Sequence, residues 1–251
     1  MNKIEEGKIL LFLYKIYMET KRNALLLSTD TLPNYWLDLK FSIAKNAWFD
    51  GIDLAMRKWF DAWDEEYVQK LSLQHEMPVY VIQTSAKLNQ KELDKALDLC
   101  QATNADTICI NAPKITDFKA YDFIAGNLKS YKENNPDIHF TIINPKDSKL
   151  FALPIPEYRF SNIIDIVKNY DSYIGLDISN IDTDSFENEF TRKIDDYAPY
   201  ISVIYLSDKT KNWRWHLIPG EWNLDLVQFL KGLKKSWYNR PISIKIDFKR
   251  V

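Results

Sequence analysis

The chain has 251 residues, of which 46% are hydrophobic and 27% are charged, and its 33 lysines and arginines nearly balance its 35 aspartates and glutamates. Such a composition predicts a soluble globular protein. A net charge of −2 provides no basic surplus for the phosphates of nucleic acid or of an anionic membrane, so we expect neither as a partner.

Two cysteines, Cys100 and Cys109, are too few for a disulfide-rich scaffold or a thiolate metal cluster. The amino end does not resemble a signal peptide. Its most apolar stretch, residues 9–14, is interrupted by Lys15 and is far shorter than the roughly 20 residues that span a bilayer. We therefore expect a reduced chain in the cytoplasm, without a membrane-spanning segment.

Short apolar or β-branched runs recur along the chain and alternate with helix-like segments, which is typical of consecutive βα units. They predict eight strands, at residues 24–28, 51–55, 79–84, 107–111, 138–144, 173–177, 201–207 and 242–247. The segment 90–102 illustrates the helices between them: Leu93, Ala96, Leu97 and Cys100 share one helical face, which predicts that Cys100 is in the core.

Eight consecutive βα units close most economically into a barrel, because parallel neighbours require right-handed crossovers. A length of 251 residues is typical of one (β/α)₈ barrel. The competing fold, an open doubly wound sheet, would bind a nucleotide at a glycine-rich turn, yet the chain has six glycines and no such motif. We predict one α/β domain over residues 1–251, a closed TIM barrel at 23–248 preceded by an N-terminal helix at 1–22.

The last predicted strand has no helix after it, whereas residues 4–20 are apolar-rich and helix-like. In a closed barrel the first and last strands are neighbours, so the N-terminal helix can replace the missing eighth helix and cover the strands there. A plug across the barrel floor and a contact with a second copy are the alternatives.

Five segments match, in order, the motif passages of one known superfamily. They are AKNAWFDGIDL (44–54), ADTICINAP (105–113), HFTIINPKD (139–147), YIGLDISN (173–180) and the stretch 203–246, which contains VIYLSDKT and HLIPGEWNLDL. This series resembles the xylose isomerase-like barrels, which include sugar isomerases, sugar epimerases and endonuclease IV. The resemblance covers nearly the whole chain after residue 22 and implies a site at the carboxyl ends of the strands.

The resemblance also implies divalent cations such as Mn²⁺, Mg²⁺ or Zn²⁺, held by carboxylates and imidazoles and used to polarise a sugar carbonyl or a phosphate. At the ligand positions of the family the chain carries Ile143 and Lys245 instead of glutamates and Asn180 and Tyr205 instead of histidines, and it keeps only Asp177 and Asp208. We therefore predict that it uses no metal or other cofactor.

Lys245 stands where the family has a metal-bridging glutamate. In the last predicted strand, isoleucines alternate with Ser243, Lys245 and Asp247, and the period-two pattern directs these three residues into the lumen. We expect the Lys245 ammonium to take the charge position of the metal and to pair with Asp177.

Four groups are candidates for general acid–base catalysis: Asp177, Asp208, His216 and Lys245. His216 aligns with a zinc-binding histidine of endonuclease IV-like proteins, but Arg214 replaces the accompanying aspartate, so we expect His216 to form a hydrogen bond or to face a substrate. His75 and His139 lie at the opposite, structural end. Asn144 and Asn180 are placed for substrate contact, or they satisfy buried backbone groups at the strand ends.

Five tryptophans follow predicted strands on the side where this fold binds substrates: Trp36, Trp59, Trp63, Trp213 and Trp215. Flat indoles stack on sugar rings and their N–H groups bond hydroxyls, so with Tyr205 and Arg214 they are candidate substrate-binding residues. The alternative for Trp59 and Trp63 is that they pack a helix onto the barrel. Arg214, with Lys209 and Lys211, can hold a phosphate on a sugar.

The sequence therefore predicts a sugar isomerase/epimerase-like barrel with a degenerate metal site, which binds a small carbohydrate or sugar phosphate with little or no metal-dependent catalysis. One alternative is an active metal-independent isomerase or epimerase that uses Asp177, Asp208, His216 and Lys245. A second alternative, an endonuclease IV-like nucleic-acid-binding protein, lacks both the zinc ligands and the basic surplus.

Overall fold

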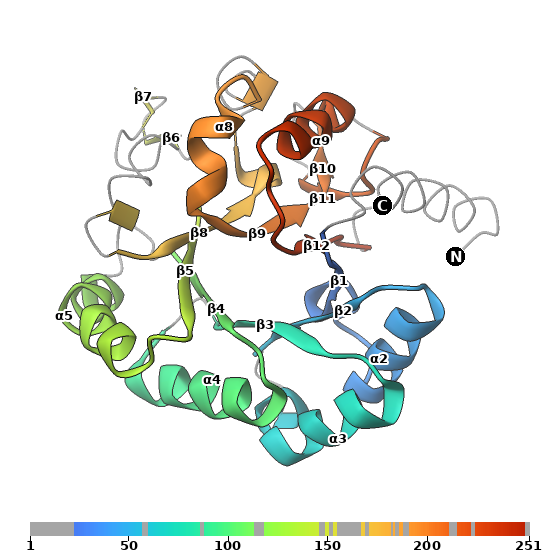
Figure 1. Ribbon diagram of the computed structural model, residues 1–251, viewed down its shortest axis with the longest axis vertical. Helices are drawn as coiled ribbons and strands as arrows, with labels where there is room; N and C mark the ends of the chain where they lie inside the picture. The colour runs from blue at the N-terminus through green and yellow to red at the C-terminus, as the bar shows by residue number, and fades with distance from the viewer. Residues whose placement is uncertain are drawn as a thin grey trace.

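Eight parallel strands close into a barrel at the centre of the molecule (Figure 1). They are β1 (Leu25–Ser28), β2 (Gly51–Ala55), β3 (Val79–Gln83), β4 (Thr107–Asn111), β5 (His139–Ile143), β8 (Tyr173–Asp177), β9 (Ile201–Leu206) and β12 (Ile242–Ile244). This computed structural model describes residues 23–56, 60–85, 88–112, 118–145, 149–150, 153–154, 167–168, 171–181, 183, 186–187, 191–210, 215–221 and 224–248.

The strands follow one another around the barrel in chain order, and β1 closes it by pairing with both β2 and β12. Leu26 of β1 is level with Gly51 on one side and with Ser243 on the other. The predicted TIM barrel is thereby confirmed, and all eight predicted strands agree with the structure to within one residue at each end except the last. That strand ends at Ile244 because the chain then takes other partners: the Ile246 N–H donates to Thr31 Oγ1 at 3.1 Å, and the Asp247 N–H donates to the His216 carbonyl at 2.7 Å.

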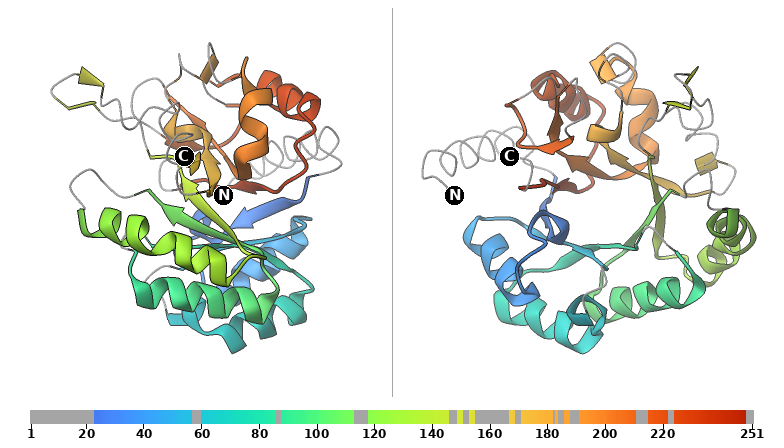
Figure 2. Two further views of the ribbon diagram at one scale, coloured as in Figure 1. Left: turned by 60° about the vertical axis from the view of Figure 1, so that its left-hand side comes forward. Right: turned by 180° about the vertical axis from the view of Figure 1, so that it is seen from behind.

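Helices cover the outside of the barrel (Figure 2). The α-helices within the described residues are α2 (Leu37–Asn46), α3 (Glu65–His75), α4 (Gln90–Thr103), α5 (Phe118–Asn134), α8 (Ile194–Tyr197) and α9 (Leu226–Lys235). Local sequence explains several ends: Asp64 and Asn89 accept the N-cap hydrogen bonds of α3 and α4, and Glu76 and Asn104 end these helices in the left-handed conformation.

Shorter elements lie between the strands and helices. They are the 3₁₀ helices η1 (Thr29–Thr31), η2 (Phe60–Trp63), η4 (Ile178–Asn180) and η6 (Ala198–Tyr200), and the two-stranded pairs β6 (Lys149–Leu150) with β7 (Leu153–Pro154) and β10 (Asp208–Lys209) with β11 (Trp215–Leu217). The β10–β11 pair follows β9 and brings His216 next to Asp177, at the carboxyl end of β8.

The apolar residues form two separate cores, one between the barrel and its helices and one inside the lumen. Cys100 is buried in the outer core, as the helical pattern predicts. The lumen core contains Leu26, Val81, Cys109, Ile143, Val203 and Tyr205. In β12 and the residues after it, Ile242, Ile244 and Ile246 belong to the outer core, which confirms the predicted register of this segment.

The predicted N-terminal helix at residues 1–22 lies outside the described residues, so its packing against the first and last strands stays a prediction. None of the described helices combines the length and the hydropathy that a membrane crossing requires.

Candidate functional site

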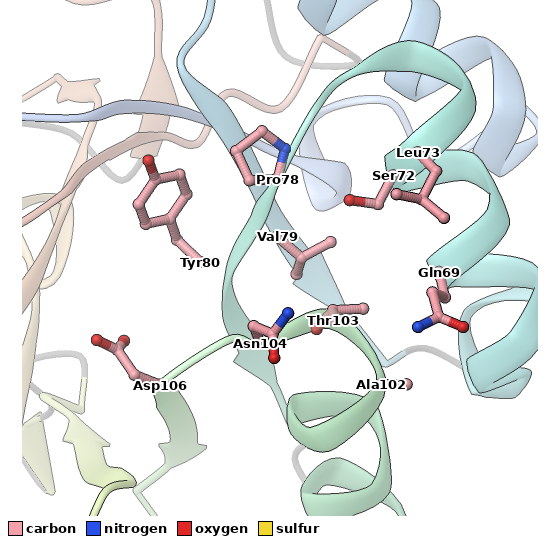
Figure 3. Close-up of a pocket in the computed structure, with 10 residues that line it drawn as sticks. All are labelled: Gln69, Ser72, Leu73, Pro78, Val79, Tyr80, Ala102, Thr103, Asn104 and Asp106. Carbon is pink, nitrogen blue, oxygen red and sulfur yellow. The ribbon is translucent and has the colours of Figure 1, made fainter.

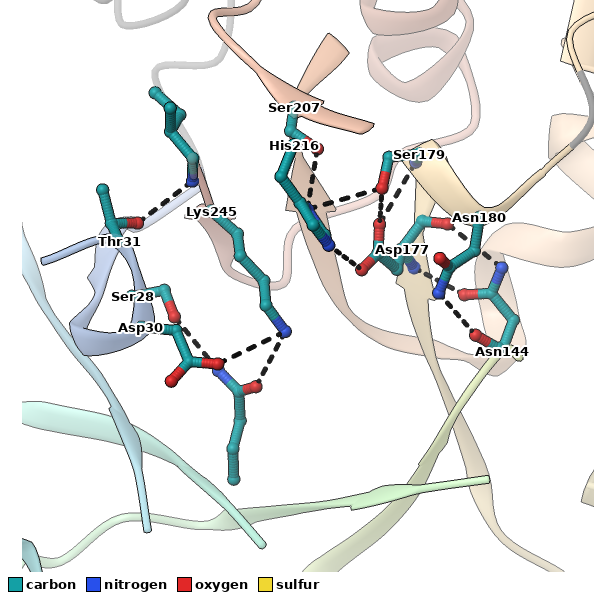
Figure 4. Close-up of polar contacts among 12 residues, drawn as sticks. Ser28, Asp30, Thr31, Asn144, Asp177, Ser179, Asn180, Ser207, His216 and Lys245 are labelled. Carbon is teal, nitrogen blue, oxygen red and sulfur yellow. Dashed lines mark hydrogen bonds and ion pairs between the residues drawn. The ribbon is translucent and has the colours of Figure 1, made fainter. Parts of the chain in front are cut away.

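Polar side chains gather at the carboxyl ends of the strands in two groups (Figure 4). The lysine group consists of Lys245 after β12, Asp30 in η1, Ser28 in β1 and Gln83 in β3. The histidine group consists of His216 in β11, Asp177 in β8, Ser179 and Asn180 in η4, Ser207 after β9 and Asn144 after β5. Because parallel strands present their carboxyl ends on one face, residues far apart in the chain meet here.

Lys245 is held by three groups that favour a positive charge. Its Nζ donates to Gln83 Oε1 at 3.2 Å, lies 3.9 Å from Asp30 Oδ2 and lies 4.9 Å from the centre of the Tyr205 ring. A carbonyl oxygen, a carboxylate and the face of an aromatic ring all attract a cation. The side chains of Lys245 and Asp30 each keep 15% of their surface exposed, so this fixed ammonium can still be reached from the mouth.

Asp53 lies in the lumen beneath this lysine and has no exposed surface. Its Oδ2 accepts hydrogen bonds from Gln83 Nε2 at 2.7 Å and from Ser243 Oγ at 2.6 Å. Burial raises the pKa of the Asp53 carboxyl to about 6, and the two hydrogen bonds and Lys245 oppose this rise. Sequence reasoning missed Asp53 and Gln83, although a charged residue in the middle of the apolar run 51–55 was the signal for Asp53.

The histidine group places an imidazole beside a carboxylate. His216 Nε2 lies 3.6 Å from Asp177 Oδ2, which is an ion-pair distance rather than a hydrogen bond. Asp177 Oδ1 accepts from the N–H and the Oγ of Ser179, at 3.1 and 2.7 Å. Burial lowers the pKa of His216 below its ordinary value of 6.5, and the nearby Asp177 opposes this only in part. The imidazole is therefore neutral at neutral pH and can accept a proton.

The two asparagines tie the ends of β5 and β8 together. Asn144 Oδ1 accepts from the Asp177 N–H at 2.6 Å, and its Nδ2 donates to the Asp177 carbonyl at 3.0 Å. Asn180 Nδ2 donates to the Asn144 carbonyl at 2.9 Å. These contacts favour the alternative in which the two asparagines satisfy backbone groups at the strand ends, and those of Asn144 position Asp177.

Asp208 occupies a structural position. It is fully buried and its carboxylate accepts from the backbone N–H groups of Lys209, Gly220 and Leu224, at 2.7, 3.1 and 3.2 Å. It therefore fixes the segment that follows β9. Tyr205 is also fully buried, with its ring in the lumen beneath Lys245, so it supports the site without an exposed surface for a substrate.

The expected ion pair between Lys245 and Asp177 is wrong. The ammonium lies against Asp30 and Gln83, whereas Asp177 faces His216. The reason is the strand order: β12 borders β1, which leads into Asp30, while β9 separates β12 from the strand that carries Asp177.

The residues at the metal positions of the family do not fit a cation. Ile143 belongs to the apolar lumen core, Tyr205 is buried and Lys245 is itself a cation. Within the described ranges no three histidine, cysteine or acidic side chains are placed to hold a metal ion. The expectation that this chain uses no metal stays a prediction.

The structure describes the side chains of two of the five predicted tryptophans, Trp36 and Trp63. Trp36, at the start of α2, is 76% exposed and available for stacking. Trp63 is half-buried and packs against the outer core, which matches the alternative weighed for it. Trp59, Trp213 and Arg214 lie outside the described residues, and of Trp215 only the backbone in β11 is described.

The other two histidines have structural contacts, as expected. His75 Nε2 lies 2.8 Å from Asp38 Oδ1, and the His139 and Tyr173 rings form a T-shaped pair at a centroid distance of 4.8 Å.

A groove of about 440 Å³ lies at the opposite, amino end of the barrel (Figure 3). It is bordered by the ends of α3 and α4 and by the start of β3. Ser72 Oγ donates to the Met77 carbonyl and Thr103 Oγ1 to the Leu99 carbonyl, so two of its hydroxyls serve the local fold. Of the candidate site residues whose side chains the structure describes, none lines this groove.

We expect the stability of the protein to fall between pH 7.5 and 5 more steeply than that of His216→Gln. The pKa of folded His216 is lowered, so the unfolded chain takes up a proton first as the pH drops through about 6.5, and this uptake favours unfolding. Urea unfolding at several pH values measures the difference. With three histidines in the chain, an NMR titration identifies His216 as the signal lost in the variant; a midpoint above 6.5 would contradict the burial argument.

Comparison with known proteins supports the fold. No protein-family model matches the chain, and no curated protein matches it. Among solved structures, the chain is similar to an AP endonuclease of family 2 from Brucella melitensis, with a TM-score of 0.69 and 16% identity over 90% of this chain and 93% of the other. A D-tagatose 3-epimerase-like protein matches with a TM-score of 0.68 and 17% identity over 89% and 90% of the two chains.

A xylose isomerase domain containing protein from Salmonella typhimurium LT2 matches equally well, with a TM-score of 0.68 and 15% identity over 90% of this chain and 89% of the other. These three sequence identities are too low for an activity to be transferred to this chain. Each match nevertheless covers nearly the whole of both chains. The chain therefore has the fold of the xylose isomerase-like barrels, as the resemblance of its strand-end motifs predicts.

Proposed function

We propose that the mouth of the barrel binds a small carbohydrate or sugar phosphate, and that it does so with little or no metal-dependent catalysis. The observation that carries this proposal is the position of Lys245, whose ammonium replaces the metal-bridging carboxylate of the resemblance and is held by Gln83 and Asp30. A fixed cation there repels a divalent metal, yet it still donates hydrogen bonds to hydroxyl or phosphate oxygens.

The groups around Lys245 suit a polyhydroxylated ligand. Asp30 can accept from sugar hydroxyls, and His216 can donate or accept, while each keeps about a sixth of its side chain exposed. The exposed indole of Trp36 follows β1 on the same rim and can stack on a sugar ring. Aromatic stacking and hydrogen bonding do not require the lost metal ligands.

One observation favours the second candidate, a metal-independent isomerase or epimerase. The neutral His216 lies beside Asp177, so it can take a proton from a sugar carbon while the carboxylate stabilises the imidazolium that forms. Lys245 can stabilise negative charge that develops on the sugar oxygen. Asp208 is not part of this candidate site, because its carboxylate is buried and accepts hydrogen bonds from backbone N–H groups.

The test is a binding screen of sugars and sugar phosphates by calorimetry and tryptophan fluorescence on metal-free protein. For the ligand that binds best, we expect Lys245→Met to weaken binding about tenfold or more, because a charge-assisted hydrogen bond is lost. The matched control, Lys234→Met on the exposed face of α9, is expected to bind as the original does. Failure of every sugar to bind would overturn the proposal.

Two further measurements separate the candidates. Titration with Mn²⁺, Zn²⁺ and Mg²⁺ is expected to show no micromolar binding, and turnover of the bound sugar is expected not to rise when metal is added. Metal-stimulated turnover of about 1 per second or faster would contradict the degenerate site. Turnover without metal that is lost in His216→Gln would favour the second candidate.

A further inference from the structure

Gln83 links the buried Asp53 to the lysine at the mouth. The Gln83 side chain is almost completely buried, and its Nε2 donates to Asp53 Oδ2 at 2.7 Å and to Ser28 Oγ at 3.2 Å. Its Oε1 faces the other way and accepts from Lys245 Nζ at 3.2 Å. Asp53 and Gln83 belong to the neighbouring strands β2 and β3, and Lys245 follows β12.

The orientation of the Gln83 amide decides whether Lys245 is attracted or repelled. The two ends of an amide have nearly the same shape but opposite hydrogen-bonding roles. After a half-turn, the NH₂ group would point at the ammonium and the carbonyl oxygen would point at the carboxylate of Asp53. Both contacts would then be repulsive, and the fully buried carboxylate of Asp53 could not turn to water instead.

We propose that Asp53 is a positioning residue, which fixes the Gln83 amide so that its carbonyl oxygen holds the Lys245 ammonium at the mouth. An ionised carboxylate only accepts hydrogen bonds, so Asp53 selects the Nε2 end of the amide. No ion pair within 4.0 Å joins the described side chains of Asp53 and Lys245, so the hydrogen-bonded path between them runs through Gln83. The inference rests on the proposed function in one respect, because the proposed function makes Lys245 a ligand-binding group.

The carboxylate of Asp53 is itself held in place. Ser243 Oγ bonds the same oxygen that receives Gln83, and the other oxygen, Oδ1, is buried without a hydrogen-bond partner among the described residues. A buried carboxylate with an unsatisfied oxygen costs free energy, and an apolar residue would avoid that cost. Its presence in the lumen is accounted for if it orients Gln83.

The test measures the reactivity of Lys245 in the ligand-free protein, by competitive labelling with acetic anhydride followed by peptide mass spectrometry from pH 6 to 10. Exposed Lys234 is the internal reference. We expect Asp53→Asn to raise the labelling rate of Lys245 about tenfold, because the amide of Gln83 is no longer fixed. Unchanged labelling in the folded variant would overturn the proposal.

A double-mutant cycle tests whether Asp53 acts through Gln83. Gln83→Leu removes the link but keeps the carboxylate, so its effect and that of Asp53→Asn are expected not to add in the double variant. Additive effects would mean that Asp53 acts by its charge alone and would overturn the proposed link. Ser243→Ala is the control: it removes a hydrogen bond of Asp53 without breaking the link, and labelling is expected to stay within about twofold.

The exchanged variant Asp53→Asn/Gln83→Glu keeps the test decisive if Asp53→Asn alone does not fold. The amide introduced at position 53 would then donate to the carboxylate introduced at position 83, whose two oxygens are equivalent, so Lys245 always meets an acceptor. We expect this variant to protect Lys245 as the original does, and a folded exchanged variant with a reactive Lys245 would contradict the proposal. Because no ligand is used, these results stand apart from the sugar-binding screen, and failure of one does not imply failure of the other.

Discussion

Replacement of Asp208 by alanine is expected to lower the free energy of unfolding by about 3 kcal/mol or more. The substitution removes the acceptor of three backbone N–H groups, those of Lys209, Gly220 and Leu224, and no solvent can replace it at a position with no exposed surface. Hydrogen bonds to a charged group contribute about 1.5 to 3 kcal/mol each, and a buried donor left unpaired adds a further cost. Urea unfolding followed by tryptophan fluorescence measures the loss.

Asp225→Ala is the matched control. Asp225 is also an aspartate that accepts a backbone N–H, from Gln228 at 2.9 Å, but it is an exposed N-cap of α9. Its loss is expected to cost about 1 kcal/mol. If Asp208→Ala were no more destabilising than this control and instead abolished sugar binding, Asp208 would face a ligand, and its assignment as a structural residue would be wrong.

The strands could be predicted from sequence because a parallel barrel buries both faces of each strand. Such strands appear as short, nearly continuous apolar runs, and the run 201–206 has no exposed residue. The order of the strands could also be predicted, since consecutive βα units place each strand beside the previous one. Local patterns therefore sufficed to predict the barrel.

The pairing of the site residues could not be predicted in the same way. Lys245 and Asp177 both lie at the mouth, but β9 separates their strands, and Asp30, which follows the neighbouring β1, is the carboxylate that Lys245 contacts. Which carboxylate meets an ammonium depends on strand order and side-chain reach rather than on local pattern. Asp53 was missed because its strand was assigned from its apolar neighbours, while the single charge among them was left without a role.

The geometry of the histidine group is a third feature that could not be predicted from the sequence. His216 and Asp177 are far apart in the chain and come together only because the β10–β11 pair folds back over the barrel after β9. The resemblance predicted the loop in which His216 lies. It predicted neither the distance of His216 from Asp177 nor the burial that lowers the pKa of His216. The structure supplies both, and these two observations are the ones that favour the second candidate function.

Gly51→Ala is expected to destabilise the protein by about 3 kcal/mol. A Cβ on Gly51 would lie 2.5 Å from Tyr80 Cδ2 and 2.6 Å from the Pro78 carbonyl oxygen. That oxygen cannot withdraw freely, because it accepts the Ile52 N–H at 2.8 Å and so helps to join β2 to β3. Overpacking at such a contact commonly costs about 1 to 3 kcal/mol, and a backbone neighbour that cannot rotate away places this site at the upper end.

Gly126→Ala on α5 provides the opposite case, since a Cβ there would meet no atom within 4 Å. Alanine is favoured over glycine inside a helix by about 1 kcal/mol, so this variant is expected to gain stability. Urea unfolding of both variants compares the same substitution at a position without space for a Cβ and at a position with space for it. A Gly51→Ala protein as stable as the original would contradict the close approach of β2 and β3. Because β2 also carries Asp53 two residues later, a folded Gly51→Ala protein is further expected to label faster at Lys245.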